Sequence, residues 1–319
     1  MTTRRYRARR LPRTRCTAAA AAAGLLMAAT SCAATGPDRE GVVVTTNILG
    51  DITREVVGDE AEVTVLMKPD ADPHSFGVSA QEAALIERSA LVVYNGLGLE
   101  EGVLRNVRAA DDAGVPTLAV GDEVDPIAYT PEDAADMAGE PDPHFWTDPL
   151  RTASAVDAIA ERVIAEVDGV DARTVRDNAA DYRDELAELD AWAAERVAEI
   201  PEDRRSLVTD HHVFGYFAQR YGFEVVGAVI PSGTTLASPS AADLESLAGA
   251  VRDAGVSAIF ADSAQPDRLA QVLADEAGVH VEVVELHAES LTGEDGGAPT
   301  YLEMVRSNTG AIAGGLGAG

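Results

Sequence analysis

The sequence has 319 residues, of which 46% are hydrophobic, and its 54 Asp and Glu residues outnumber its 25 Lys and Arg residues. This length is typical of about two domains, since one domain takes ~100–200 residues. The formal net charge of −29 argues against two binding modes that need clustered cations, an electrostatic grip on nucleic acid and a polybasic attachment to a membrane surface.

The first 32 residues have the composition of an export signal. They contain seven arginines and no acidic residue, and the arginines precede an apolar run from Thr17 to Ala29. That run is too short to span a bilayer, which takes about 20 apolar residues. A basic start, a short apolar middle and small residues after it are typical of a signal peptide. We therefore expect residues 1–32 to be removed and the chain to be exported.

Cys32 follows this run in Ala29-Thr30-Ser31-Cys32, which resembles a bacterial lipobox, although such boxes usually have an aliphatic residue such as leucine where Ala29 stands. The resemblance implies that Cys32 is acylated and anchors the chain to the outer face of the cell membrane. The alternative is ordinary cleavage nearby, with Cys32 unused. Residues 33–41 then form a polar tether. Removal of seven arginines leaves 18 cationic against 54 acidic residues, so the mature chain carries a formal charge of −36.

Residues 42–147 alternate between short β-branched or apolar runs and amphipathic segments. The pattern predicts strands at Val42–Thr46, Ala61–Met67 and Ala90–Tyr94 and helices at Ile48–Val57 and Ser79–Arg88. The alternation continues to about Gly121 and indicates a parallel sheet with crossover helices. The acidic stretch 122–139 is expected to be a surface loop. We interpret residues 42–147 as an N-terminal α/β lobe.

Residues 148–200 contain helix-forming residues with no strand pattern. Within them, Asp171–Ile200 predicts one helix of about 30 residues and ~45 Å, because each residue adds ~1.5 Å. Its apolar residues recur at three- and four-residue steps. A helix of this length between two sheet-forming halves is expected to join two lobes.

Residues 201–319 return to the alternating pattern and are interpreted as a C-terminal α/β lobe. Strands are predicted at Ser206–Thr209, Phe223–Ile230, Ser257–Ala261 and Val279–Leu286, and helices at Val213–Arg220, Ala241–Ala254, Pro266–Ala277 and Thr300–Ala313. The fold class is therefore α/β, with two lobes of parallel-type sheets joined by one long rigid helix. A ligand site is expected in the cleft between the lobes.

Four residues that follow predicted strands or loops are candidate metal ligands. The tripeptide Asp-Pro-His occurs twice, ending at His74 and His144, and its proline stiffens the approach to each imidazole. His211 comes after the strand that ends at Thr209, and Glu289 follows the strand that ends at Leu286. Two ligands per lobe would converge on the cleft. Three imidazoles and one carboxylate form a set that tetrahedral zinc accepts.

Two other residues compete for these places. His212 competes with His211, but a helix start near His212 would point that side chain along the helix. Asp262 competes with Glu289, but Asp262 is expected instead to cap the helix after Pro266 or to close that turn. The remaining histidines, His280 and His287, lie on or next to a predicted strand and are expected to be structural or solvent-facing.

Several motifs together resemble those of the metal-binding lipoproteins of zinc/manganese ABC importers. The resemblance covers nearly all of the mature chain and rests on Pro69–Phe76, Asn95–Glu100, Pro143–Pro149, His211–Gly222, Glu289–Leu291 and Thr300–Met304. It implies two α/β lobes bridged by a rigid helix, with one divalent ion between them. By motif position, the ligands implied are His74, His144, His211 and Glu289.

The chain also departs from that family in three ways. His212 stands where the family commonly has an aspartate, and Glu289 stands where an aspartate is frequent. The stretch 122–140 contains no histidine, whereas many zinc-binding members carry a histidine-rich loop there. A histidine at position 211, where manganese-type relatives tend to have a glutamate, favours zinc because imidazole suits zinc and manganese prefers oxygen ligands.

We therefore interpret the chain as an extracytoplasmic solute-binding protein that captures one Zn²⁺ and delivers it to an ABC permease, with Mn²⁺ as the alternative cargo. We expect a monomer that binds no nucleic acid. A zinc hydrolase is disfavoured because catalytic zinc keeps one coordination position open and no His-Glu-x-x-His motif occurs. A binder of a chelated metal is disfavoured because only 5% of the residues are aromatic. The chain is thus not expected to be an enzyme.

Overall fold

The computed structural model describes residue 2 and residues 41–130, 137–277 and 281–317. The expected signal peptide, Cys32, tether residues 33–40 and His280 therefore lie outside the described residues. Within the described part of the chain, no helix combines the length and the apolar character that a membrane span needs.

The first sheet is parallel and has the strand order β2-β1-β3-β4. Its strands are β1 (Val42–Val44), β2 (Val63–Val65), β3 (Leu91–Tyr94) and β4 (Thr117–Ala119). The chain runs from β1 to β2 on one side and then to β3 on the other side of β1. In open parallel sheets, ligands bind at the carboxyl ends of the strands beside such a reversal.

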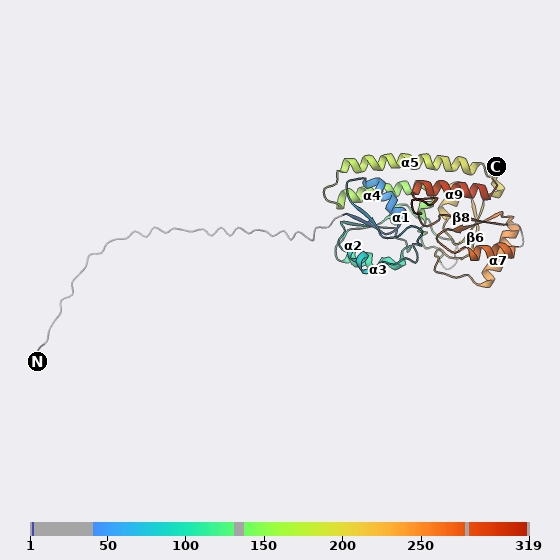
Figure 1. The fold of residues 1–319 in the computed structure, drawn as a ribbon, viewed down its shortest axis with the longest axis horizontal. Coiled ribbons are helices and arrows are strands. Elements are labelled where there is room, and N and C mark those ends of the chain that lie inside the picture. The colour runs from blue at the N-terminus through green and yellow to red at the C-terminus, as the bar shows by residue number, and fades with distance from the viewer. Residues whose placement is uncertain (1, 3–40, 131–136, 278–280, 318–319) are drawn as a thin grey trace. The chain divides into compact units, whose positions relative to one another are not determined.

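Helices cover both faces of this sheet, as an all-parallel sheet requires. Alternate residues of β1 and β3 face opposite ways. Val43 and Val92 pack toward α2 (Ala80–Ile86) and α3 (Glu101–Asp112). Val42 and Val44 pack instead toward α1 (Asn47–Val57), α4 (Pro149–Glu166) and α5 (Ala172–Ala198). Figure 1 shows α2 and α3 below the sheet and α1, α4 and α5 above it.

The second sheet repeats the same topology in the order β6-β5-β7-β8. Its strands are β5 (Ser206–Thr209), β6 (Glu224–Ala228), β7 (Ala258–Asp262) and β8 (Glu282–Leu286). One face packs on α7 (Ala241–Ala254) and α8 (Arg268–Ala277). The other face packs on α5, α6 (Gly215–Tyr221) and α9 (Tyr301–Gly315). The described residues also include short 3₁₀ turns at Val120–Glu123, Phe145–Thr147 and Glu202–Arg204. The expectation of two α/β lobes with parallel sheets is confirmed.

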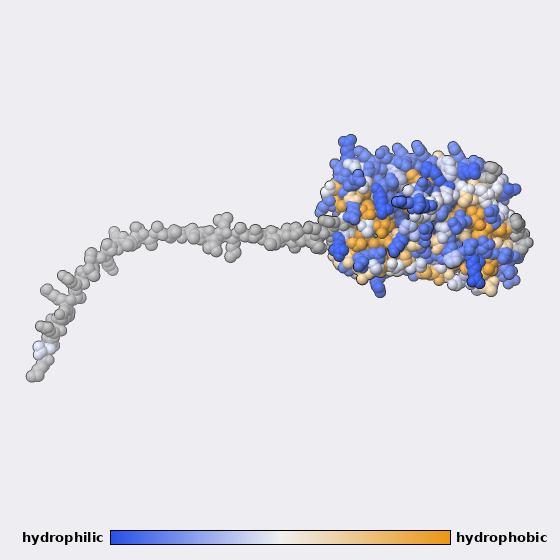
Figure 2. Space-filling model, viewed as in Figure 1, coloured by the Kyte–Doolittle hydropathy of each residue, from blue (hydrophilic) through white to orange (hydrophobic). Residues whose placement is uncertain are grey.

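More than one of the described helices contributes side chains to both cores, and even the short α6 has Tyr216 in the first core and Phe217 in the second. Along α5, Val175 and Leu186 belong to the core of the first sheet, whereas Ala193 and Val197 belong to that of the second. α9 does the same, because Tyr301 packs in the first core and Ile312 in the second. In Figure 1, α4 and α9 lie in line beneath α5. The outer face of α5 is covered with hydrophilic side chains (Figure 2). The sequence predicted the bridge formed by α5 but not the one formed by α9.

The predicted element boundaries were right within a few residues, with one error that bears on the site. The helix expected to start near His212 begins at Gly215, because residues 210–212 form a bend. The helix ends at Tyr221, where Gly222 takes a left-handed conformation. His212 therefore precedes the helix by three residues, and the argument that it points along a helix was wrong.

Candidate metal centre

His74, His144, His211 and Glu289 converge on one point between the two sheets. One ligand atom from each lies within 4.8 Å of the others. Glu289 Oε1 is 3.0 Å from His74 Nε2 and 3.3 Å from the Nε2 atoms of both His144 and His211. The three rings have centroids 5.4–5.6 Å apart and are steeply inclined to one another. All four residues are at most 2% exposed.

Each of these residues follows the carboxyl end of a strand or its loop. His74 lies in the loop after β2, and His144 immediately precedes the 3₁₀ turn Phe145–Thr147. His211 comes two residues after β5, and Glu289 comes three residues after β8. Each lobe thus supplies two of the four side chains. Separation of the lobes would dismantle the site.

The aspartate of each Asp-Pro-His tripeptide orients its histidine. Asp72 Oδ1 accepts the backbone N–H of His74 at 2.8 Å, and Asp142 Oδ1 accepts that of His144 at 2.9 Å. An aspartate that bonds the backbone two residues further on forms a compact turn. The repeated tripeptide was noticed in the sequence, but only its proline was given a role. Its aspartate, which could have been inferred from the same spacing, was missed.

The outward nitrogens of two imidazoles bond to carboxylates. His144 Nδ1 lies 2.7 Å from Asp142 Oδ1 and 3.2 Å from Tyr129 Oη. His211 Nδ1 lies 3.0 Å from Asp210 Oδ2. A carboxylate at Nδ1 fixes the tautomer with the proton on Nδ1, so the lone pair of Nε2 faces the centre, as in metal-ligating histidines.

At the centre, nitrogen and oxygen atoms that can accept hydrogen bonds face one another. Among the described residues, His211 Nε2 and both Glu289 oxygens have no hydrogen-bond partner. His144 Nε2 and His74 Nε2 are only 3.4 Å apart. Unsatisfied buried acceptors are costly, and a cation at their common point would satisfy all of them. Three imidazole nitrogens and a carboxylate are a zinc-type donor set that iron and manganese sites also use in part.

The charges at the centre shift its pKa values in opposite directions. Burial lowers the pKa of His144 and His211, but the carboxylates of Asp142, Asp210 and Glu289 more than offset this, and both pKa values are raised. Burial raises the pKa of Glu289, but the imidazoles of His211 and His74 more than offset it and hold this pKa well below its usual value. Glu289 is therefore ionised, and without a metal the cluster would hold protons in its place.

The segment that carries Glu289 is held by residues of the first lobe. Asn47 Nδ2 donates to Ser290 Oγ at 2.8 Å, and Asn47 Oδ1 accepts from the N–H of Leu291 at 3.0 Å. The indole N–H of Trp146 donates to the carbonyl of Ala288 at 2.8 Å. Asn47, at the start of α1, gave no sign of this role in the sequence.

The alternative residues take other positions. His212 is buried but lies outside the convergent group, and its backbone N–H donates to the carbonyl of Ser232. Asp262 also lies outside the group. Its Oδ1 accepts from the N–H of Ala288, and its main-chain carbonyl accepts from the N–H of Gln265. Asp262 therefore closes the turn before α8, which is one of its two expected roles. The other expected role, a cap on α8, was wrong, since α8 begins only at Arg268. His287 Nδ1 lies 3.0 Å from Ser263 Oγ, which fits the expected structural role.

The chain is similar to known metal-binding proteins along most of its length. Residues 42–315 match the family described as "Zinc-uptake complex component A periplasmic". The zinc-binding protein TroA of Treponema pallidum is 29% identical over 86% of this chain and 88% of its own. The iron-binding protein YfeA of Yersinia pestis is 28% identical, covering 86% of each chain. The manganese-binding lipoprotein MntA of Halalkalibacterium halodurans is 26% identical over 88% of this chain and 91% of its own.

Solved structures agree with the sequence comparisons. The structure of the periplasmic zinc-binding protein TroA from Treponema pallidum superposes with a TM-score of 0.79 at 27% identity, covering 87% of this chain and 99% of that one. The Mn-bound periplasmic metal-binding protein from Candidatus Liberibacter asiaticus gives a TM-score of 0.76 at 26% identity. The names of these relatives mention zinc, iron and manganese, and another structure of the Candidatus Liberibacter asiaticus protein is described as Cd-bound, so they agree on metal binding but not on one metal.

Proposed function

Because the chain belongs to the family of the periplasmic component A of zinc-uptake complexes, we propose that its cargo is one Zn²⁺, which it captures outside the cytoplasm and delivers to an ABC permease. The family consists of solute-binding proteins of metal ABC transporters and not of enzymes, so the expectation of a non-enzyme is confirmed. The coarser function, a metal-binding component of an ABC importer, follows from the family itself.

The observation that carries the choice of zinc is the donor set. Three Nε2 atoms and one carboxylate oxygen converge within 4.8 Å, and imidazole nitrogen suits zinc, whereas manganese prefers more oxygen donors. His74, His144, His211 and Glu289 are the proposed ligands. With four protein ligands the site is closed, unlike a catalytic zinc site with its open position. Coordination by both oxygens of Glu289 would make the ion five-coordinate and would weaken the preference for zinc over Mn²⁺.

Capture and release follow from the burial of the site. The proposed ligands are almost inaccessible to solvent and come two from each lobe, so an ion can enter or leave only when part of the structure around the site moves. We further propose that residues 1–32 are a signal peptide, that acylated Cys32 anchors the chain to the outer face of the cell membrane, and that the protein acts as a monomer. The relatives named as lipoproteins support the anchor.

A competition titration tests the choice of metal. The mature chain, stripped by a chelator, is titrated at neutral pH with Zn²⁺ in the presence of increasing Mn²⁺. We expect one equivalent of zinc to be retained when Mn²⁺ is in large excess. Displacement of zinc by comparable Mn²⁺ would refute the zinc assignment while leaving the transport role intact. Two retained equivalents would refute the single site.

A further inference from the structure

The segment 230–239, here called the interlobe loop, joins β6 to α7 in the second lobe and is gripped by the first lobe at Asp72, at Tyr129 and at Met137, whose Sδ lies 3.4 Å from Gly233 N. The first grip is Asp72. Its Oδ1 holds the backbone of His74, and its Oδ2 accepts from Thr235 Oγ1 at 2.8 Å and from Gln265 Nε2 at 2.9 Å. One carboxylate therefore links a candidate ligand of the first lobe to the loop of the second.

The second grip is Tyr129. Its hydroxyl lies 3.2 Å from His144 Nδ1 and 3.3 Å from Asp142 Oδ1. The same side chain packs on the loop at Gly233, where a Cβ atom would come within 2.3 Å of the hydroxyl. Gly233 is thus the point at which Tyr129 fits against the loop. The loop is also tied to the residue that follows the third candidate ligand, His211, because the backbone N–H of His212 donates to the carbonyl of Ser232.

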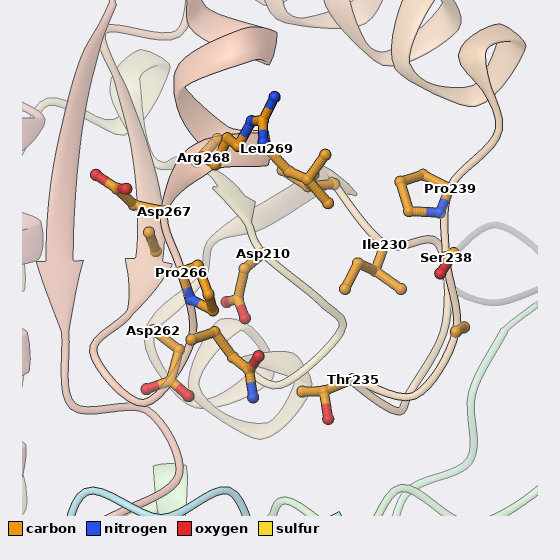
Figure 3. A pocket seen from close by; sticks show the side chains of 15 residues that line it. Asp210, Ile230, Thr235, Ser238, Pro239, Asp262, Pro266, Asp267, Arg268 and Leu269 are labelled. Carbon is orange, nitrogen blue, oxygen red and sulfur yellow. The ribbon is translucent and has the colours of Figure 1, made fainter. Parts of the chain in front are cut away.

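The interlobe loop covers a cavity rather than a packed core. A cavity of about 320 Å³ lies behind it, lined on the loop side by Ile230, Thr235, Ser238 and Pro239 and on the far side by Asp262 and the turn into α8. Figure 3 shows Thr235, Ser238 and Pro239 on one side of this space and Asp262 and Pro266 on the other. Leu236 at the tip of the loop is 52% exposed. A segment with few packed contacts needs little free energy to move.

We propose that Asp72 and Tyr129 are positioning residues that couple metal coordination by His74 and His144 to the placement of the interlobe loop. When the ion draws both imidazoles to the centre, the Asp72 carboxylate and the Tyr129 hydroxyl meet the loop and hold it down. Without the ion, the loop is free to lift over the cavity. The exposed tip of the loop thereby signals whether the site is loaded. This inference rests on metal binding at the proposed site, but not on which metal binds.

Hydrogen exchange of the mature chain, with and without one equivalent of Zn²⁺, tests the coupling. We expect zinc to slow exchange across the interlobe loop by at least about tenfold, since closing free energies of ~1.4 kcal/mol correspond to that factor. The double variant Thr235→Val/Gln265→Leu removes both donors to Asp72 Oδ2 and leaves the bond from Asp72 to His74. In this variant, we expect zinc still to bind, the slowing to be lost, and zinc to dissociate about tenfold faster.

Two controls match these changes. Thr234→Val makes the same substitution one residue away, at a hydroxyl that accepts from Leu236 N–H within the loop, and should behave as the native chain. Tyr129→Phe should weaken the slowing, whereas Tyr182→Phe should not, because among the described residues the buried Tyr182 hydroxyl has no hydrogen-bond partner.

Three outcomes would overturn the coupling: equal exchange of the loop with and without metal in the native chain, native slowing in the double variant, or an equal loss in Thr234→Val. The first outcome is measured on the native chain alone, so the coupling is tested even if the double variant fails to fold. Failure of the native chain to bind either Zn²⁺ or Mn²⁺ would instead count against the proposed function.

Discussion

At the scale of single residues, the candidate site could be predicted because histidine is rare in this chain and because the candidate ligands stand shortly after a strand or in a repeated tripeptide. Six histidines and two copies of Asp-Pro-His were enough to select His74 and His144. The residues that orient the ligands could not be found in this way. Asp210, Tyr129 and Asn47 stand in no motif that marks them, and only the fold brings them against the histidines and the loop of Glu289.

The adjacent histidines 211 and 212 give a direct test of the assigned ligand. His211 Nε2 faces the centre, whereas His212 lies outside the group. We expect His211→Ala to weaken zinc binding by at least about a hundredfold, because a four-ligand site loses one of its donors. His212→Ala should change affinity by less than about tenfold, because His212 lies outside the group and the loss is expected to stay below the roughly 10–100-fold cost of removing a residue that orients a metal ligand. Isothermal titration with a competing chelator measures both, and the reverse ranking would contradict the assignment.

The raised pKa values of His144 and His211 predict how binding depends on pH. Protons compete with the metal for Nε2, so zinc affinity should begin to fall at a pH above the ordinary histidine value of ~6.5. In the metal-free protein, a raised histidine pKa contributes stability that is present below the unfolded value and is lost as pH rises through the folded value. The metal-induced rise in melting temperature should therefore grow from pH 5.5 to 8.5.

Thermal melts of the metal-free and zinc-loaded chain across this range measure the effect. His287→Gln serves as a control, since His287 bonds Ser263 away from the centre and its loss should leave the slope unchanged. A metal-induced shift that stays constant with pH would show that protons and metal do not share these nitrogens.

At the scale of elements, hydrophobic periodicity located most helices and strands, and local chemistry fixed their ends. Ser79 and Ser240 cap the starts of α2 and α7 in capping boxes, in which an acidic residue stands three positions after the serine. What periodicity could not show was that α9 crosses between lobes. Nothing in the sequence indicates that Tyr301 and Ile312 pack in different cores, because that assignment depends on tertiary packing.

A carboxylate of the first lobe, that of Asp51, binds the backbone at the start of α9, and its burial leads to a prediction about stability. Asp51 accepts the backbone N–H of Tyr301 at 2.8 Å, and burial raises the pKa of Asp51 to about 6. An acid whose folded pKa exceeds its unfolded value destabilises the fold as pH rises through these two values. Asp51→Asn keeps an acceptor and removes the buried charge. It should raise the free energy of unfolding at pH 8 by on the order of 2 kcal/mol and have little effect at pH 4.

Urea unfolding of the metal-free chain at the two pH values measures this difference. Asp157→Asn, at an exposed ion pair with Arg183, is the matched control and should change stability by less than about 1 kcal/mol at either pH. If Asp51→Asn were destabilising at pH 8, the charge of Asp51 would be needed at the start of α9 and the burial argument would fail.

At the scale of the whole molecule, the two lobes share one topology, and three of the four candidate ligands lie in the segments that follow β2, β5 and β8, whereas His144 precedes the 3₁₀ turn Phe145–Thr147. This is why the alternating pattern and the post-strand positions of the ligands were sufficient to predict both the fold class and the cleft. The specific distances of the centre, and the loop that closes over the cavity, depend on contacts between residues more than 100 positions apart, such as Asp72 with Thr235. No local pattern encodes those contacts.

The charge of the molecule leads to the last prediction. Without its first 32 residues, the chain carries 54 acidic against 18 cationic residues. Such an excess repels itself and opposes the compact state, and salt screens this repulsion over a Debye length of about 10 Å at 0.1 M. The melting temperature of the metal-free mature chain should therefore rise as NaCl increases from a few millimolar to about 0.3 M. The comparison uses a chelator throughout, so that trace metal does not contribute.

Because the repulsion also acts between the lobes, low salt should favour their separation and speed the dissociation of zinc. A melting temperature that is flat or falls with NaCl would mean that the ion pairs the salt also screens, such as Arg220 with Asp190 between α6 and α5, outweigh the net repulsion.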